Sequence, residues 1–177
     1  MNKKNKIVLI LLLIIATMVG LFLLQTNVRK RELILTDFKN EQEYQFGEVS
    51  WNSNVSEVEN LLDCTLKQVP NGDPNYKYYG ISDVIFVLNG YEAKTSVEFR
   101  MGELVYIDFA FKELENPQAL FDEIISVWQE QYGPETTINA SENIGKISYH
   151  WRTEKTQLSV AFSKDIDEVR IFLASLV

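Results

Sequence analysis

Carboxylates are the side chains of this sequence whose spacing could support acid–base chemistry. Asp108 lies in an alternating stretch between Ile107 and Phe109, on the face opposite the core, and Glu98 lies on the corresponding face of the alternating stretch before it. Two carboxylates that face each other across neighbouring strands could act as a glycosidase-type pair or bind calcium. Arg100, two residues after Glu98, instead favours a salt-bridged surface. We therefore expect two solvated charges on an open sheet face. An enzyme that uses such carboxylates on cell-envelope substrates is the alternative.

Other catalytic and metal-binding groups are scarce. His150 is the single histidine, and the alternation of its strand predicts that it lies opposite Tyr149 and Trp151 and faces solvent. Cys64, the single cysteine, follows an apolar helix end, which indicates a core residue rather than a nucleophile. The phosphate-loop, H-E-x-x-H, C-x-x-C and G-x-S-x-G patterns do not occur. The sequence therefore predicts no enzyme, no cofactor and no metal site.

Three tyrosines give the best prediction of a binding surface. Tyr76, Tyr78 and Tyr79 follow a turn-forming stretch at 70–74, and tyrosine combines a large contact area with a polar tip. In an extended chain Tyr76 and Tyr78 share one face, whereas Tyr79 lies on the other. The three residues fit either an edge strand whose tyrosines cover the core or an exposed aromatic patch that contacts a protein. The sequence leaves both interpretations open.

The charge distribution restricts the partners. All 25 acidic residues follow Arg31, together with 11 of the 17 basic residues, so residues 32–177 carry a formal net charge of −14. A domain this acidic is a poor match for nucleic acid or for an anionic lipid surface, and we expect no nucleic-acid partner. One cysteine allows no intramolecular disulfide, and a domain of this length can bury a sufficient core without one.

Residues 7–24 form an uncharged apolar stretch in which Thr17 is the one polar side chain. As a helix this stretch would span about 27 Å, enough to cross the hydrocarbon core of a bilayer. Basic residues flank it on both sides, and it lacks the small-residue cleavage site of a secretory signal. We therefore expect an uncleaved signal anchor at 1–31, a single-pass membrane protein, and a folded domain on the extracytoplasmic side. A cleaved signal peptide and the reversed orientation are the alternatives.

Local capping signals predict two helices. Asn54 and Glu57 have the spacing of a capping box and begin a helix over 55–63. An Asn-Pro pair at 116–117 begins a second helix over 117–132, which ends before a Gly-Pro pair. Both helices carry an apolar stripe at helical spacing, so each is expected to cover a sheet.

Apolar and alternating runs predict two groups of three strands. The predicted strands cover 84–88, 95–101, 104–111, 145–151, 156–162 and 168–176. In the third of these, alternation predicts that Val105, Ile107, Phe109 and Phe111 face the core. Each group of strands follows one helix, which is the pattern of two similar halves.

The predicted fold class is α+β. After the anchor at 1–31 and a linker at 32–43, one domain covers 44–177, with halves at 44–112 and 116–177. Each half is a helix followed by an antiparallel meander, and together the halves form a two-layer sandwich. The opposite face of the sheet is expected to be partly polar.

The element order resembles the β-lactamase inhibitor protein-like fold, and small outer-membrane assembly lipoproteins use a related single unit. The residues that carry the resemblance are Phe46-Gly47, Trp51, Glu57-Val58 and Leu61-Leu62 in the first half, and Tyr132-Gly133-Pro134, Trp151 and Thr156 in the second. The resemblance implies a non-enzymatic binding scaffold. The sequence lacks the disulfides of the inhibitor and the lipidated cysteine of the assembly factors, so no partner-contact residue is transferred. Our leading hypothesis is a membrane-anchored, extracytoplasmic protein-interaction module whose membrane contact is residues 7–24.

Overall fold

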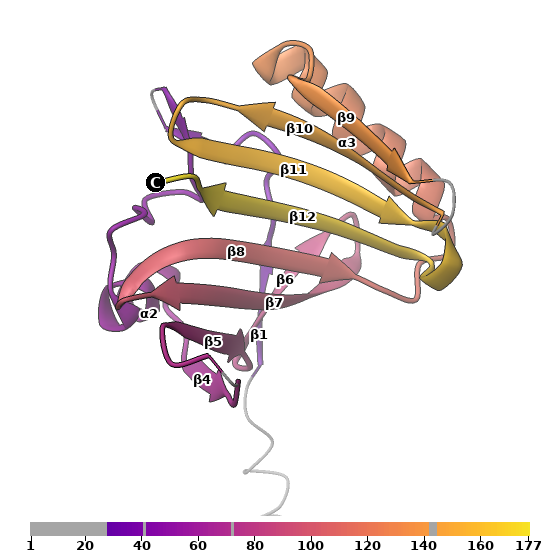
Figure 1. Ribbon diagram of the computed structural model, residues 1–177. Coiled ribbons are helices and arrows are strands. Elements are labelled where there is room, and N and C mark those ends of the chain that lie inside the picture. Colours follow the sequence, from indigo (N-terminus) through magenta and orange to yellow (C-terminus); the bar gives the residue numbers. More distant parts are fainter. Residues whose placement is uncertain (1–27, 41, 72, 142–144) are drawn as a thin grey trace, which may run out of the picture.

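Ten strands form one mixed sheet, which a short separate hairpin accompanies (Figure 1). The computed structural model describes residues 28–40, 42–71, 73–141 and 145–177. The strands of the sheet are β1 (Arg29–Glu32), β4 (Leu66–Val69), β5 (Tyr76–Ile81), β6 (Val84–Leu88), β7 (Tyr91–Arg100), β8 (Glu103–Phe111), β9 (Thr137–Ser141), β10 (Lys146–Arg152), β11 (Thr156–Ser163) and β12 (Glu168–Ser175). Their order is β1-β6-β7-β8-β12-β11-β10-β9, and the β4–β5 pair joins β7. The β1–β6 pair is parallel and the other pairs are antiparallel.

Both helices begin where the sequence predicts. Helix α2 (Val55–Leu62) has a complete capping box, in which Asn54 Oδ1 accepts from Glu57 N at 3.1 Å and Glu57 Oε2 accepts from Asn54 N at 2.8 Å. Helix α3 (Pro117–Tyr132) has its proline at the first turn, where no intrahelical donor is lost. These signals depend only on neighbouring residues, which is why the sequence suffices to place them.

Helix α3 packs on the side of β10, β11 and β12 that forms the core. Trp128 is fully buried and meets Trp151 edge to face, with ring centroids 5.3 Å apart. Phe121 packs against Phe162, with ring centroids 5.7 Å apart, which is within the usual range for aromatic pairs in protein cores. Trp128 Nε1 also donates to the carbonyl of Leu35 at 2.8 Å, so the helix is tied to the first part of the chain.

The predicted two-layer sandwich of two antiparallel repeats is wrong. The two groups of three predicted strands exist, but β8 pairs with β12 and joins both groups into one continuous sheet. Strands β1, β4, β5 and β9 extend this sheet, and β1 makes it mixed because it runs parallel to β6. The added strands lie at or near sheet edges and lack a regular apolar alternation, so periodicity does not detect them.

The expected single-pass membrane protein is not supported. Within residues 28–40, 42–71, 73–141 and 145–177, no helix is both long enough and apolar enough to cross a membrane. Helix α2 has 8 residues and α3 has 16, whereas a spanning helix needs about 20 apolar residues. The signal-anchor and extracytoplasmic predictions rested on 7–24, which lies outside the described residues. We therefore withdraw those predictions.

Residues expected to form a linker belong to the core. Leu33, Leu35 and Phe38 are buried, and a two-stranded hairpin of β2 (Lys39–Asn40) and β3 (Glu43–Tyr44) follows them. Phe38 lies against three other aromatic rings, including Trp128 at 5.6 Å. The segment crosses the core side of the sheet, which explains its apolar residues better than a helical extension does.

One β-bulge changes which side chains of β8 face the core. Phe99 pairs with Leu104 although Glu98 pairs with Tyr106, so Val105 has no partner in the ladder. As a result Leu104 is fully buried, whereas Val105, which the alternation assigns to the core, is only partly buried. Ile107, Phe109 and Phe111 beyond the bulge face the core as predicted.

Candidate functional site

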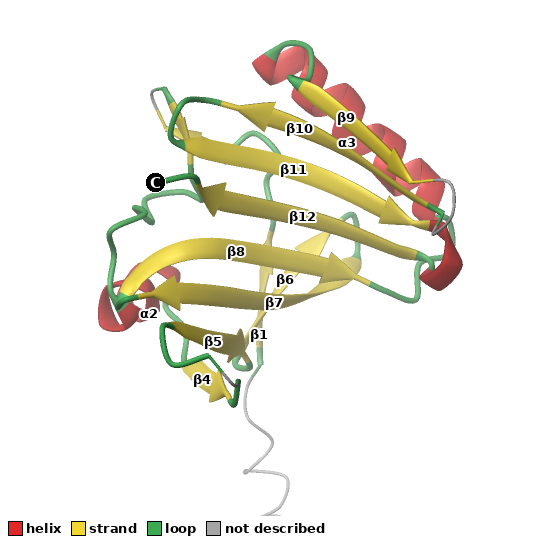
Figure 2. Ribbon diagram, viewed as in Figure 1, coloured by secondary structure: helices red, strands yellow, loops and turns green. Residues whose placement is uncertain are grey.

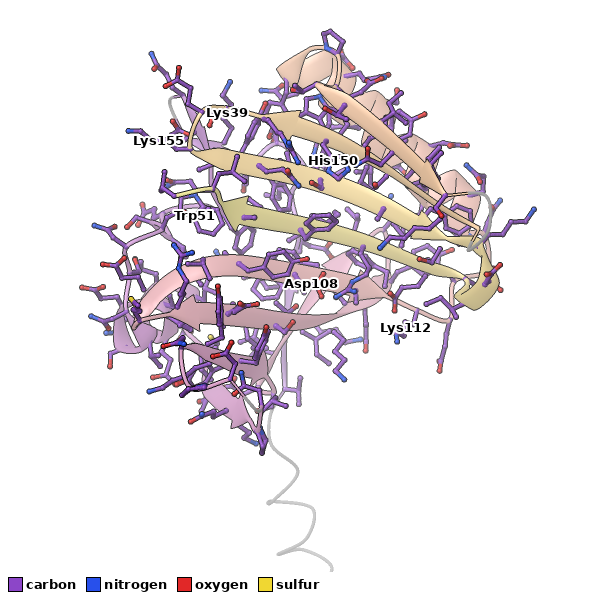
Figure 3. All side chains as sticks on the ribbon, viewed as in Figure 1. Lys39, Trp51, Asp108, Lys112, His150 and Lys155 are labelled. Carbon is purple, nitrogen blue, oxygen red and sulfur yellow. The ribbon has the colours of Figure 1, made fainter. Side chains whose placement is uncertain are left out.

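The sheet has one face that packs on the core and an opposite face over which no described element lies; we call the latter the uncovered face (Figure 2). Register places Ser96, Asp108, Phe172, Ser159 and His150 side by side on this face, one from each of five neighbouring strands. Figure 3 shows Asp108 on β8 and His150 on β10, with two strands between them. Residues far apart in sequence therefore share one surface.

Tyr106 and Phe172 form an aromatic pair near the middle of the uncovered face. Their ring centroids are 5.7 Å apart with 30° between the planes, and both side chains are partly exposed. The Phe172 ring also lies 6.2 Å from the His150 ring, centroid to centroid. Burial raises the pKa of Tyr106 above its usual range, so its phenol stays neutral and can donate or accept a hydrogen bond. The pair supplies apolar contact area on an otherwise polar face.

A buried ion pair lies on the same face. Arg170 donates from Nε to Asp108 Oδ1 at 3.0 Å and from Nη2 to Asp108 Oδ2 at 2.6 Å. Asp108 is 2% exposed, whereas the Arg170 side chain is 39% exposed. Burial raises the pKa of Asp108 while the Arg170 guanidinium opposes that shift, and the hydrogen bonds to Asp108 raise the pKa of Arg170. The two-pronged contact indicates that both groups are charged, since it requires two acceptor oxygens.

A second carboxylate extends this pair into a chain of charges. Glu168 is also buried, with Oε2 at 3.0 Å from Lys112 Nζ and Oε1 at 3.8 Å from Arg170 Nε. The Lys112 ammonium and the Arg170 guanidinium lie nearer to solvent than the two acids. At this corner of the face, cations therefore cover acids.

The alternative in which Glu98 and Asp108 face each other across the ladder does not match the register, and the expectation that both are solvated does not hold for Asp108. Asp108 lies opposite Ser96, and Glu98 lies opposite Tyr106, so the two carboxylates are diagonal neighbours. Asp108 is also buried rather than solvated. Burial raises the pKa of Glu98, and a hydrogen bond from Tyr78 acts in the opposite direction. The two acids do not form the facing pair that glycosidase chemistry would use.

The expectation that His150 faces solvent is wrong, because polar neighbours enclose the ring. Nδ1 lies 2.8 Å from Ser159 Oγ, and Nε2 lies 3.0 Å from both Ser148 Oγ and Asn139 Nδ2. Burial lowers the pKa of His150, and the charges of basic neighbours lower it further. His150 is therefore neutral at pH 7.

Amide and hydroxyl groups surround both ring nitrogens of His150. Arg152 Nε donates to Gln157 Oε1 at 2.5 Å, which turns the Gln157 amide nitrogen toward Ser159 Oγ at 2.8 Å. The same amide nitrogen lies 3.2 Å from His150 Nδ1, which the Ser159 hydroxyl also contacts. His150 Nε2 meets the Asn139 amide nitrogen and the Ser148 hydroxyl, so each ring nitrogen has one amide nitrogen and one hydroxyl within hydrogen-bond distance. Both ring nitrogens are engaged, and neither is free to act as a base.

The exposed charges of the uncovered face are mainly positive. The basic side chains that reach solvent from it include Lys94, Arg100, Lys112, Lys146, Arg152 and Arg170. Among the acids, Asp108 and Glu168 are buried and Glu98 is partly buried. Glu103 is exposed opposite Arg100 in the ladder, and Glu92 at the sheet margin pairs with Lys30 at 2.6 Å. Residues 32–177 as a whole carry −14, so this face differs in sign from the rest of the chain.

A groove adjoins the basic end of the uncovered face. It has a volume of about 610 Å³ and opens where β6 separates from β5. Its wall carries charges of both signs, from Lys94, Lys112, Glu92 and Glu113, and an apolar lining that includes Ala110, Ile85 and Val84. The groove can therefore take an apolar side chain beside charged groups.

The structure separates the three tyrosines of the predicted binding patch. Tyr76 and Tyr78 of β5 lie on the uncovered face, opposite Arg100 and Glu98 of β7, and Tyr78 is 40% exposed. Tyr79 lies on the core side and meets another aromatic ring edge to face at 5.4 Å. Tyr79 therefore covers the core while Tyr78 reaches solvent, and contact of the tyrosines with a protein stays a prediction.

Cys64 and the acids offer no further chemistry in the described residues. Cys64 is buried, and desolvation raises its pKa to about 11, which agrees with the prediction of a core residue. In the part of the chain that the structure describes, no three His, Cys, Asp or Glu side chains converge as metal ligands.

No protein-family model and no curated protein matches the chain. The chain is similar to a DUF4309 family protein (YjgB) from Bacillus subtilis, known from a crystal structure. The two share 17% sequence identity and a TM-score of 0.44 over 80% of this chain and 90% of that one. A likeness this distant carries no argument about function, and the resemblance to the β-lactamase inhibitor protein-like fold is not confirmed by it.

Proposed function

We propose that the chain is a protein-binding module that holds an acidic segment of its partner on the uncovered face. The supporting observation is that three basic side chains of this face reach solvent, whereas two acidic side chains beside them are buried. Lys94, Lys112 and Arg170 reach solvent, whereas Asp108 and Glu168 lie buried and already paired. An approaching carboxylate therefore meets cations before acids, and this favours an acidic partner over a basic one.

Arg170 is the anchor of the proposed contact. Asp108 holds its guanidinium from one side, through Nε and one hydrogen of Nη2. The other N–H groups of the fork remain for a carboxylate of the partner, and the side chain is partly exposed. Because Asp108 already fixes the rotamer of Arg170, little side-chain entropy is lost on binding.

Tyr106 and Phe172 supply the apolar part of the same surface. Partly exposed aromatic rings next to a held arginine are the residue types that dominate protein interfaces. The apolar lining of the groove beside Lys94 extends this area. The element order, which resembles that of a non-enzymatic binding scaffold, is in keeping with a binding function.

The rival function, an enzyme that works through carboxylates of this face, is less well supported. Asp108 is engaged by Arg170 through both oxygens, and His150 is engaged through both ring nitrogens. A general acid or base needs an atom free to exchange a proton with substrate. The raised pKa values of Glu98 and Asp108, both caused mainly by burial, favour the rival.

The test selects peptides rather than assuming a partner. A random peptide library displayed on phage is selected against the full-length protein, and enriched peptides are titrated by fluorescence anisotropy. We expect enriched peptides to contain Asp or Glu and to bind more weakly as salt rises. Replacing both Lys94 and Lys112 with glutamine should weaken binding by about tenfold or more, which is about 1.4 kcal/mol. The matched control is Lys155→Gln, which changes an exposed lysine in the turn between β10 and β11 (Figure 3).

Two results would contradict the proposal. One is enrichment of peptides without acidic residues, or of none at all. The other is equal loss of affinity in Lys155→Gln and in the Lys94→Gln, Lys112→Gln double variant, because that outcome would reflect net charge rather than this face.

A further inference from the structure

The described sheet has three edge strands, β1, β4 and β9. Two of them carry residues that discourage pairing with a further strand, and the third does not. Strand β1 reads Arg-Lys-Arg-Glu, with a charge at every position, and β4 contains Lys67 and is followed by Pro70. Charged residues and proline are the usual protections of a free edge. Strand β9, Thr137–Ser141, reads Thr-Ile-Asn-Ala-Ser, without charge or proline. All five of its residues are exposed. Edge β9 alone is therefore open to a further strand.

We propose that β9 pairs with β9 of a second copy of this chain, antiparallel about a two-fold axis at Asn139. In this register Asn139 meets Asn139 of the second copy, Ile138 meets Ala140, and Thr137 meets Ser141. All five residues are used, and no like charges meet because the strand has none. A two-fold contact brings the same surface of both copies together, so that surface must be complementary to itself. Strand β9 meets this requirement in the register described.

A pocket beside β9 fits the side chain that the second copy would bring. Ala140, Ile147 and Phe162 line a pocket of about 260 Å³ on the core side of the sheet, close to Gln118 at the start of α3. Ile138 lies on the core side of the same strand and is 48% exposed. Opposite Ala140, the second copy's Ile138 would reach this pocket and lose its exposed apolar surface.

The pairing leaves the uncovered face free. A two-fold axis between antiparallel strands is perpendicular to the sheet, so the uncovered faces of both copies point the same way. The proposed partner-binding surface would thereby be doubled, although the pairing does not depend on that proposal. Five residues on each side bury little area, so we expect reversible association at high concentration rather than an obligate dimer.

The first test is sedimentation equilibrium of the full-length protein and of Ile138→Lys in the same buffer. The wild type should show a concentration-dependent dimer, and the variant should weaken dimerisation by at least about tenfold. Residues 7–24 are identical in both proteins, so association through them would not change. A circular dichroism melt checks that the exposed substitution leaves the fold intact.

The second test locates the two-fold axis. Asn139→Cys should form an intermolecular disulfide under mild oxidation, because paired Cα atoms of an antiparallel ladder lie about 4.5–5.5 Å apart. Thr137→Cys is the matched control, since four residues of register separate its two copies by about 13 Å. A wild type that stays monomeric, a dimer that Ile138→Lys leaves unchanged, or equal cross-linking at 137 and 139 would each overturn the proposal.

Discussion

The asymmetry of the ion pair between Asp108 and Arg170 makes a quantitative prediction about stability. The Asp108 side chain is 3% exposed and the Arg170 side chain is 39% exposed, so only the arginine can exchange its partner for water. Arg170→Met keeps most of the apolar volume of the side chain and leaves a buried carboxylate unpaired. Asp108→Asn leaves a guanidinium that water can reach. The arginine substitution should therefore cost more than the aspartate substitution.

The magnitude follows from the cost of an uncompensated buried charge. Removing one partner of a fully buried pair costs about 3–5 kcal/mol. Since Arg170 is partly solvated here and other cations lie near, we expect about 2 kcal/mol for Arg170→Met. A loss of this size lowers the melting temperature of a chain of this length by about 4–8 °C. The double variant Asp108→Asn, Arg170→Met should recover at least half of the loss, because no charge remains buried.

The pH dependence supplies the independent check. Without Arg170, burial and the nearby Glu168 charge both act to raise the pKa of the carboxyl, and the folded pKa of Asp108 lies further above its unfolded value. Stability is then complete below the unfolded pKa and is lost as pH rises through the folded pKa. Urea unfolding of Arg170→Met should accordingly show its deficit at pH 7 and a smaller deficit near pH 4. A deficit below about 0.5 kcal/mol, or one equal to that of Asp108→Asn, would refute this account of the pair.

Three further predictions concern the core and the uncovered face. Trp128→Ala should destabilise the fold by about 3–5 kcal/mol in urea unfolding, because the side chain is fully buried; a loss below about 1 kcal/mol would contradict that packing. Burial depresses the folded pKa of His150, so wild-type stability should fall as pH decreases from about 6.5 through the folded pKa, and His150→Gln should remove that dependence in a pH series of unfolding midpoints. Tyr79→Ser should lower the melting temperature by more than Tyr78→Ser does, since only Tyr79 packs on the core side; equal shifts would show that both are core.

Elements fixed by neighbouring residues could be predicted from the sequence. The capping box of Asn54 and Glu57 and the proline at the start of α3 are local signals, and both helices are confirmed to within one residue. The six strands with apolar alternation exist, because half-buried strands must alternate. The edge strands could not be predicted, since β1 is charged throughout and β9 is exposed at every position.

The site was harder to predict than the fold. Alternation placed Asp108 on the face away from the core, but its partner Arg170 lies 62 residues later and depends on the register between β8 and β12. A signal for the His150 network was present: Ser148 and His150 alternate in one strand, and Ser159 holds a matching position in the next. Polar residues at matching positions in neighbouring strands can hydrogen-bond to each other. When each strand is considered alone, the same residues are assigned to solvent and these hydrogen bonds are not predicted.

The uncovered face has a composition that stability alone does not explain. A sheet face without a covering layer needs polar side chains to avoid exposing an apolar patch, and solvated lysines or threonines would meet that need. Here Asp108, Ser159 and His150 are instead buried within the face and held by hydrogen bonds, at a desolvation cost that solvated residues avoid. What these contacts do provide is a fixed orientation for the groups that remain exposed, Arg170 above all. A surface whose exposed groups are held in advance loses less entropy on binding, and the proposed binding function would make use of that property.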